Sequence, residues 1–254
     1  MARLHLLGTG SANTSPDRTT TMLAVHDAGS SILVDCGGDV IHRMLAAGLE
    51  IDAIDGIIIT HEHPDHVAGF PLFIEKLWLA RRARPIPVYG IRPAIAQASR
   101  CWEAFETDQW RGVPEIQWVE VDHSENAAVL SDDKWNITAS PGVHGVPVVG
   151  LRIESKNSGG VVTYSCDTEP CAAIERLAAG SALLIHEANG LTNGHTSASQ
   201  AAQVAASANA EHLVLVHLPA HVSVEEMEAA REIFPRTEIG KDLSQYDFKP
   251  ITSG

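Results

Sequence analysis

The chain has 254 residues, 44% of them hydrophobic, and a formal net charge of −14. That length can bury a sizeable core, and the lack of a compositional break predicts a single domain over 1–254. The acidic balance counts against a long polyanionic substrate without excluding a small phosphorylated one. No apolar run is long enough to cross a membrane, and the N-terminal segment lacks a signal-peptide pattern, so we expect a cytoplasmic protein with no membrane partner.

The first half of the chain alternates segments with strand and helix patterns. Apolar residues at helical spacing predict helices over 39–51 and 69–83, and a helical or irregular segment follows over 94–112. Apolar runs bounded by turn residues predict strands over 3–10, 19–27, 30–38, 53–60 and 86–90.

The second half repeats the alternation. Helical spacing recurs over 169–180, 197–209 and 223–234, and the strand-like segments are 115–121, 135–142, 148–155, 159–167, 182–189 and 212–219. Two sets of strands, each followed by helices, bury their apolar faces best by packing together with the helices outside. We therefore expect an α/β fold in which two mixed β-sheets pack face to face as an αββα sandwich.

Four side chains that commonly bind metals are crowded into six positions after the strand 53–60. The segment reads HEHPDH and contains His61, His63, Asp65 and His66. In an extended turn, His61 and His63 point to the same side and can bind one ion, while Asp65 and His66 reach a second. The histidines at 5, 26, 42, 123 and 212 occur singly and are interpreted as structural. The cluster therefore indicates a metal site.

Further candidate ligands follow later strands. His144 comes after "NITASPG", Asp167 after "VVTYSC" and His217 after "LVLV", and Asp35 in "LVDCGG" is placed to orient a ligand. Loops at strand ends can converge on one pocket. Imidazoles and carboxylates without thiolates suit zinc or manganese, and the four cysteines are scattered with no C-x-x-C pair. Seven groups suit two ions that share a bridging carboxylate.

One dense basic run, ARRARP at 80–85, stands out in this acidic chain. It has two interpretations, a solvated helix end or a patch that steers a phosphate-bearing substrate. We favour the helix end, because a short run is more often a solvated surface than a binding site.

Several motifs, in order, resemble those of the ribonuclease Z branch of the metallo-β-lactamase superfamily. They are "LHLLGTGSANTSPDRTT", "LVDCGGD", "IIITHEHPDHVAGFPLFI", "PVYG", "VVTYSCDT", "LLIHEANGLTNGHTSASQAA" and "LVLVHL", and they run from residue 4 to 218. The "HEA" before "GHTSA" is specific to that branch, whereas the whole superfamily shares the histidine cluster. The resemblance implies the αββα fold, a hydrolase domain and two Zn²⁺ ions, with Mn²⁺ as a possible substitute.

The resemblance also implies a role for each candidate residue. It assigns His61, His63 and His144 to one ion, Asp65, His66 and His217 to the other, and Asp167 to the bridge between them. It implies that His195 assists catalysis and that Glu187 holds it. In the resulting mechanism, Asp65 accepts a proton from the attacking hydroxide while it ligates, and His195 protonates the leaving oxygen or donates a hydrogen bond to the phosphate.

The chain departs from the branch in three places. Pro64 stands where the branch usually has glycine, and "HLPAHV" replaces the expected continuation after the last ligand. The tRNA-gripping arm of the branch normally separates the third-motif histidine from the bridging aspartate, but His144 and Asp167 are too close in sequence to hold it. We therefore expect a phosphodiesterase that acts on a small or cyclic nucleotide-type diester or an RNA 3′ end. A homodimer is possible, with Trp78, Trp102 and Trp110 at its interface or in the core.

Two other function classes compete with a phosphodiesterase. A metal-dependent hydrolase of a lactone, thioester or β-lactam would not need the "HEA" and "GHTSA" elements. A redox relative of the diiron branch would have glutamate in place of His63, and a degenerate binding module would have lost ligands. The motifs therefore favour phosphodiester hydrolysis.

Overall fold

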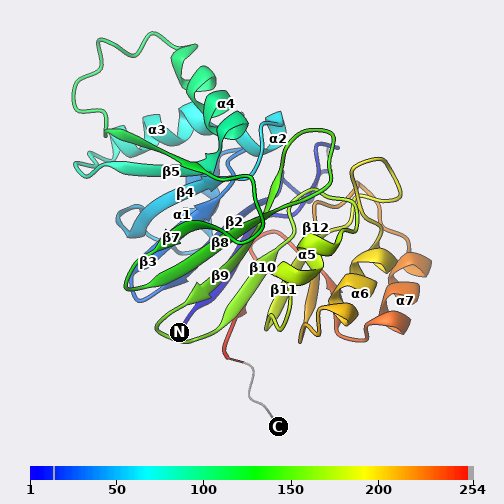
Figure 1. Cartoon of the computed structure of the whole chain (residues 1–254). Coiled ribbons are helices and arrows are strands. Elements are labelled where there is room, and N and C mark those ends of the chain that lie inside the picture. Colours follow the sequence, from blue (N-terminus) through cyan, green and yellow to red (C-terminus); the bar gives the residue numbers. More distant parts are fainter. Residues whose placement is uncertain (14, 251–254) are drawn as a thin grey trace.

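Two seven-stranded β-sheets form the centre of the computed structural model, which describes residues 1–13 and 15–250 (Figure 1). Strands β3 to β6 of the first sheet and β10 to β13 of the second are parallel, and the other pairs are antiparallel. The first sheet has the order β14 (Gln245–Asp247), β1 (Arg3–Gly8), β2 (Met22–Asp27), β3 (Ser30–Val34), β4 (Ile54–Ile59), β5 (Ile86–Ile91) and β6 (Ile116–Val121). The second has the order β13 (Thr237–Ile239), β12 (Leu213–Val216), β11 (Leu183–Glu187), β10 (Val161–Tyr164), β9 (Val149–Ser155), β8 (Trp135–Pro141) and β7 (Ala127–Ser131).

Helices cover the outer sides of the two sheets, so the predicted αββα fold is confirmed (Figure 1). On the first sheet lie α1 (Val40–Ala46), α2 (Pro64–Val67), α3 (Phe70–Leu79) and α4 (Arg92–Glu103), and a 3-10 turn, η1 (Ile51–Ala53), precedes β4. On the second lie α5 (Ala172–Leu177), α6 (Ala198–Ser207) and α7 (Val224–Ile233). Within the described residues, no helix has both the length and the apolarity that a membrane crossing requires.

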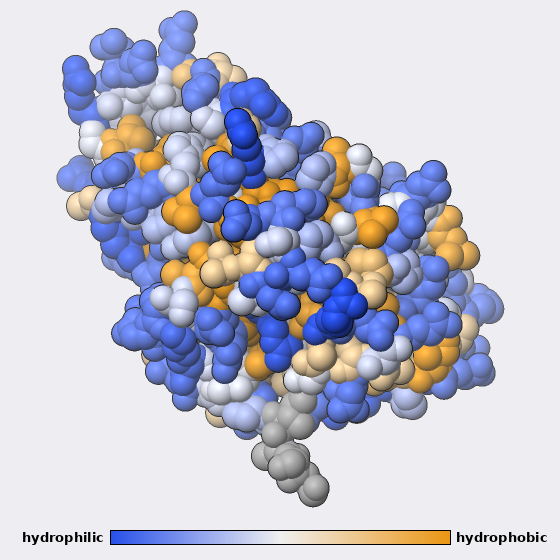
Figure 2. Space-filling view, viewed as in Figure 1, coloured by the Kyte–Doolittle hydropathy of each residue, from blue (hydrophilic) through white to orange (hydrophobic). Residues whose placement is uncertain are grey.

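The two sheets are joined by a buried apolar core and by polar contacts across it. Trp135 on β8 is fully buried, and its indole nitrogen donates to Oγ of Ser30 on β3 at 2.8 Å. Oγ of Ser155 on β9 donates to Asp27 on β2 at 2.6 Å. Hydrophilic residues cover most of the face in Figure 2, with hydrophobic residues exposed between them in small groups. The sandwich therefore has its core between the sheets, with buried hydrogen bonds that fix how the sheets align.

The turn that carries the histidine cluster packs directly on the end of β3. The backbone N–H of Cys36 donates to the carbonyl of His66 at 2.8 Å, and that of Gly69 donates to the carbonyl of Cys36 at 2.8 Å. A Cβ on Gly37 would lie only 1.7 Å from the carbonyl oxygen of Asp65. Glycine at this position therefore lets the two backbones touch, and the contact fixes Asp65 and His66 beside the sheet.

Candidate metal centre

The histidine cluster is a short connection between β4 and α2. His63 has an extended backbone, with φ −66° and ψ 147°, and Pro64 opens α2 as its first residue. Proline favours this arrangement, because it keeps the preceding residue extended and fits the first turn of a helix. The proline that departs from the usual motif therefore separates the extended histidines from the helical Asp65 and His66.

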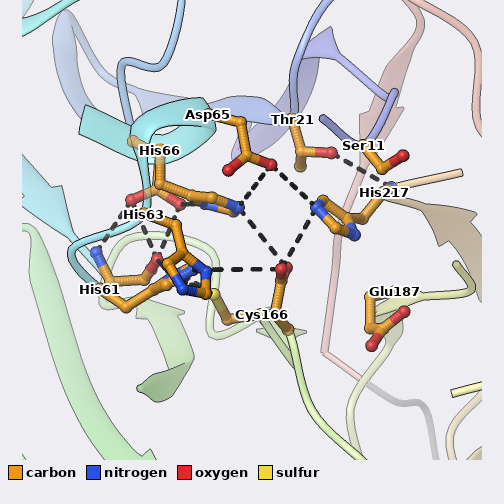
Figure 3. Close-up of polar contacts among 12 residues, drawn as sticks. Ser11, Thr21, His61, His63, Asp65, His66, Cys166, Glu187 and His217 are labelled. Atoms are coloured by element: carbon orange, nitrogen blue, oxygen red, sulfur yellow. Dashed lines mark hydrogen bonds and ion pairs between the residues drawn. The ribbon is translucent and has the colours of Figure 1, made fainter. Parts of the chain in front are cut away.

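The second sheet supplies the other candidate ligands from the loops after β8, β10 and β12. Asp35, Cys166 and His217 stand just after β3, β10 and β12, and their φ angles are 60°, 53° and 50°. Left-handed backbone is unfavourable for residues with a side chain and often marks functional sites. The chain therefore turns sharply at three strand ends, and Figure 3 labels Cys166 and His217 at two of them, beside the cluster.

Three imidazoles converge in a first group. Nδ1 of His63 lies 3.1 Å from Nε2 of His61 and 3.1 Å from Nε2 of His144. The three ligand atoms all lie within 4.8 Å of one another. A neutral imidazole has one ring nitrogen without a proton, and this nitrogen can bind a cation. Three imidazoles whose nitrogens converge on one point therefore form a suitable site for a metal ion.

A second group combines a carboxylate with two imidazoles. Oδ2 of Asp65 lies 3.3 Å from Nε2 of His217 and 3.6 Å from Nε2 of His66 (Figure 3). These three ligand atoms also lie within 4.8 Å of one another. The two groups have the members that the family resemblance implies for the two ions, and the assignment of ligands to ions stays a prediction.

Asp167 lies between the two groups. Its Oδ2 is 4.0 Å from His61 Nε2, 3.9 Å from His144 Nε2 and 3.2 Å from His217 Nε2. Its Oδ1 is 3.6 Å from His66 Nε2, and both of these buried atoms have no hydrogen-bond partner among the described residues. Buried polar atoms without partners are costly, so their convergence fits divalent cations bound at this place.

The pKa shifts around Asp167 favour an ionised Asp167, a protonated His66 and a neutral His61. Burial alone would raise the pKa of Asp167, but His217 and His66 hold that pKa well below its ordinary value. Burial would lower the pKa of His66, but Asp167 and Asp35 raise it well above its usual range. Burial and the neighbouring His66 lower the pKa of His61 far below its usual range. A divalent cation here would replace the proton that the carboxylates stabilise on His66.

A layer of hydrogen bonds orients the imidazoles. Oδ2 of Asp35 lies 2.8 Å from Nδ1 of His66, and Oδ1 accepts from the backbone N–H of Thr60 at 2.9 Å. Nδ1 of His144 lies 2.7 Å from the carbonyl oxygen of Gly194. Because carboxylate and carbonyl oxygens only accept, His66 and His144 carry their protons on Nδ1. Their Nε2 atoms are therefore free to face Asp167 and His63. Asp35 has the orienting position predicted for it.

His195 and Glu187 form a separate pair beside these groups. Oε1 of Glu187 lies 3.0 Å from Nδ1 of His195 and accepts from the N–H groups of Thr168 and Thr196, each at 3.1 Å. Burial lowers the pKa of His195, but Glu187 outweighs that effect and raises it above the usual value. The His195 ring lies 5.0 Å from that of His144 and 5.5 Å from that of His217, centroid to centroid.

A cavity of about 150 Å³ opens over the cluster. Among the described residues, its lining holds neither lysine nor arginine, and its only aromatic rings are imidazoles. Three neutral polar residues in the lining, Ser11, Asn13 and Asn189, were not assigned from the sequence. The glycine-rich turn after β1 was the available signal for two of them, because Gly8 and Gly10 bring the loop against residues 18–20.

The basic run at 80–85 lies apart from this cavity. Arg82 is buried, and its guanidinium donates to the carbonyls of Ile54 and Pro85. Arg84 forms an ion pair with Asp55 at 2.6 Å. The run follows the end of α3 and exposes Arg81 and Arg84, as the helix-end interpretation predicts, but Arg82 is buried and donates to backbone carbonyls. A larger cavity of about 740 Å³ lies beside Trp78 and Arg81 and shares no lining residue with the cavity over the cluster.

Comparisons with known proteins agree with this geometry. Residues 30–218 match the family model described as a beta-lactamase superfamily domain. A ribonuclease Z from Methanothermobacter thermautotrophicus is 30% identical over 312 aligned positions that cover 100% of this chain and 99% of the relative. Two similar solved structures are the metallo-beta-lactamase fold protein YhfI from Bacillus subtilis, with a TM-score of 0.79 and 22% identity, and the short form of human tRNase Z, with 0.78 and 23%. Each comparison covers 96% of this chain and 98% of the other.

Proposed function

From the premise that this chain belongs to the beta-lactamase superfamily and, within it, to the ribonuclease Z proteins, we propose that it hydrolyses small nucleotide-type phosphodiesters with two Zn²⁺ ions. Membership makes the protein a metal-dependent hydrolase of phosphodiester bonds. The proposal adds the number and identity of the ions, the ligands of each ion, and the size of the substrate. A hydrolase of lactones, thioesters or β-lactams is not favoured.

The observation that carries the proposal is Asp167 between two ligand groups. We assign His61, His63 and His144 to one ion, Asp65, His66 and His217 to the other, and Asp167 to both, and the distances given above support this assignment. Nitrogen and carboxylate ligands suit zinc. The thiol of Cys166 also lies near His61 and His66, but it donates to Oγ1 of Thr60 at 3.0 Å and burial raises its pKa well above the usual value. Cys166 is therefore left outside the ligand set.

In the proposed reaction, residues beside the metal centre would accept and donate the protons. When bound, two cations lower the pKa of water and neutralise charge on the phosphoryl oxygens. Asp65 lines the cavity, where its carboxylate can accept the proton that the attacking water gives up. Glu187 holds the proton on Nδ1 of His195, so Nε2 of a charged His195 can protonate the leaving oxygen. His195 is then the general acid and Glu187 its positioning partner.

The size of the substrate follows from the cavity and from the missing arm. The 150 Å³ cavity can take a phosphodiester group, but its described lining has no side chain on which a base could stack except imidazoles. Between His144 and Asp167 the chain forms only β9, a turn and β10. The 312-position alignment with the archaeal relative is longer than this 254-residue chain, so that relative has segments without a counterpart here. These features support a small diester more than a structured RNA.

A panel of substrates tests the proposal. Zinc-loaded protein is incubated with bis(p-nitrophenyl) phosphate, cyclic nucleotides, pre-tRNA, a lactone and a β-lactam, and an Asp167→Ala variant serves as the matched blank. We expect turnover of the small diesters and none of the lactone or β-lactam. Efficient removal of a pre-tRNA 3′ trailer at physiological salt would contradict the assignment to small diesters, and preferred cleavage of the lactone would overturn phosphodiester hydrolysis.

The homodimer, the single domain and the cytoplasmic location stay predictions. The three tryptophans named for an interface are all partly buried within the chain, where Trp78 stacks on Trp110 at 4.4 Å and Trp102 packs against the core. Sedimentation equilibrium of the zinc-loaded protein would decide between monomer and dimer.

A further inference from the structure

Gly194 is held by hydrogen bonds on both sides of its backbone. Its N–H donates to Oε1 of Glu169 at 2.8 Å, and its carbonyl oxygen accepts from Nδ1 of His144 at 2.7 Å. The next residue in the chain is His195. One glycine therefore connects an imidazole of the proposed metal centre with the proposed general acid.

The turn around Gly194 makes few other hydrogen bonds. Thr192 N–H donates to Gly190 and His195 N–H donates to Thr192, and both bonds lie inside the turn. In the described part of the chain, the bonds of Gly194 with Glu169 and His144 are the only hydrogen bonds that join 191–194 to the rest of the protein. The side chain of Glu169 is thus one of two fixed points for this turn.

Glu169 is itself firmly placed. Its backbone N–H donates to the carbonyl of Val143 at 2.8 Å, and the N–H of Val143 donates to Oγ1 of Thr168 at 2.9 Å. These two bonds pair the segment after Asp167 with the segment that carries His144. A displacement of Glu169 would therefore also shift the segments that carry Asp167 and His144.

Close packing makes the position of Gly194 sensitive. Its φ is +80°, and a Cβ there would lie 2.7 Å from Nδ1 of His144. No side chain separates the backbone of the turn from the imidazole, so a small shift of Gly194 changes the hydrogen bond that orients His144. The same shift moves His195 along with it.

We propose that Glu169 is a positioning residue, whose carboxylate fixes the Gly194 N–H and thereby orients His144 and places His195 against the leaving oxygen. The role in proton transfer rests on the proposed function, whereas the anchoring of the turn does not. Nothing in the histidine cluster requires an acidic residue two positions after the bridging aspartate, so Glu169 adds a functional residue to the set that the motifs indicated.

The kinetic test compares Glu169→Ala, Glu169→Gln and Glu175→Ala in the zinc-loaded enzyme. Glu175 is an exposed acid on α5 whose side chain has no hydrogen bond or ion pair among the described residues, so its variant controls for the lost charge. With a diester that has a poor leaving group, Glu169→Ala should lower kcat by roughly 10–100-fold and change KM little, the range found for residues that orient metal ligands. Glu169→Gln keeps an acceptor oxygen and should recover most of that loss.

A double variant separates positioning from a general loss of structure. If Glu169 acts through His195, the change Glu169→Ala should cost little when His195 is already alanine, since the two effects are then not additive. A double variant whose kcat falls by the full product of the two single losses would overturn the path through His195. Competition with a chelator should show weaker zinc binding in Glu169→Ala, because His144 is less well oriented, and unchanged affinity would overturn that part.

Hydrogen exchange of the metal-free protein tests the anchoring without any activity. The segment 190–196 should exchange about 10-fold faster or more in Glu169→Ala than in the wild type or in Glu175→Ala, since a hydrogen bond to a charged acceptor is lost. Helix α7 should exchange at the same rate in all three proteins, which verifies that they are folded. Equal exchange over 190–196 would overturn the proposal. If the wild type cleaves no diester at all, the proposed function fails, while the exchange result still decides the role of Glu169.

Discussion

Nδ1 of His195 lies 3.0 Å from Oε1 of Glu187, a carboxylate that solvent does not reach. Backbone N–H groups of Thr168, Asn189 and Thr196 also donate to this carboxylate, so it is fixed on several sides. A buried acid held in this way cannot turn toward the cavity. It therefore holds Nδ1 of His195 and leaves Nε2 available for the proposed proton transfer.

Replacing His195 by alanine should affect turnover but leave the metals in place. We expect both zinc ions to be retained and kcat for a poor-leaving-group diester to fall by roughly 10²–10⁴, the usual range for a lost general acid. A p-nitrophenolate ester should lose less, because its leaving group needs little protonation. Steady-state kinetics and elemental analysis check this, with the exposed His221→Ala as control. Loss of zinc, or wild-type cleavage of the poor-leaving-group diester, would contradict the assigned role.

The charge of Glu187 should set where activity falls at high pH. Glu187 raises the pKa of His195 above its usual value, so His195 keeps the proton that it donates to a higher pH, and kcat should fall as the pH rises through that raised pKa. Glu187→Gln removes the charge, so the fall should move to lower pH, with a smaller loss of kcat than in His195→Ala. The measurement is kcat against pH with saturating zinc, and an unshifted profile would sink the prediction.

Asp167→Ala should empty or scramble the metal centre. The change removes an oxygen that lies between both ligand groups, and it leaves two positive ions without their shared carboxylate. We expect two zinc ions per chain in the wild type, and one or none in the variant, by elemental analysis of protein purified without chelator. Asp133→Ala, at an exposed aspartate, should keep both ions. Full zinc occupancy in Asp167→Ala would refute the bridging assignment.

His5 should make the fold less stable in acid. Burial, His26 and Arg3 lower its pKa to about 4 from an ordinary 6.5, so below pH 6.5 the unfolded chain takes up a proton that the folded chain refuses. Stability from this residue is thus lost as the pH falls from about 6.5 to about 4 and is constant below, for a total of roughly 2–3 kcal/mol. Urea unfolding of metal-free His5→Leu should show a flatter pH dependence than the wild type or the exposed His42→Leu, and parallel curves would count against it.

Much of the fold and of the candidate site could be predicted from local sequence patterns. The apolar run before His61 predicted β4, and the ligands after it could be placed because strand ends are local features. Strands β7, β13 and β14 escaped notice, since three to five residues paired at a sheet edge leave little periodicity. Their existence depends on partners far away in the chain.

The contacts that position residues around the site could not be predicted from the sequence in the same way. Two examples are the hydrogen bond between Glu169 and Gly194 and the one from Arg82 to the carbonyl of Ile54. Both depend on how separate loops meet after folding. Neither residue stands in a spacing that any chemistry demands. The pairing of His195 with Glu187 was implied only by resemblance to a family, because seven residues of irregular chain lie between the two.

Each cation in the proposed centre would draw on both halves of the sandwich. His61, His63, Asp65 and His66 come from the first sheet, whereas His144, Asp167 and His217 come from the second. Bound ions would therefore link the two sheets, and their binding free energy would oppose a force that separates the sheets. In a single-molecule pulling experiment with handles on the two halves, we expect adding a chelator to lower the rupture force, although no residue of the apolar core has changed.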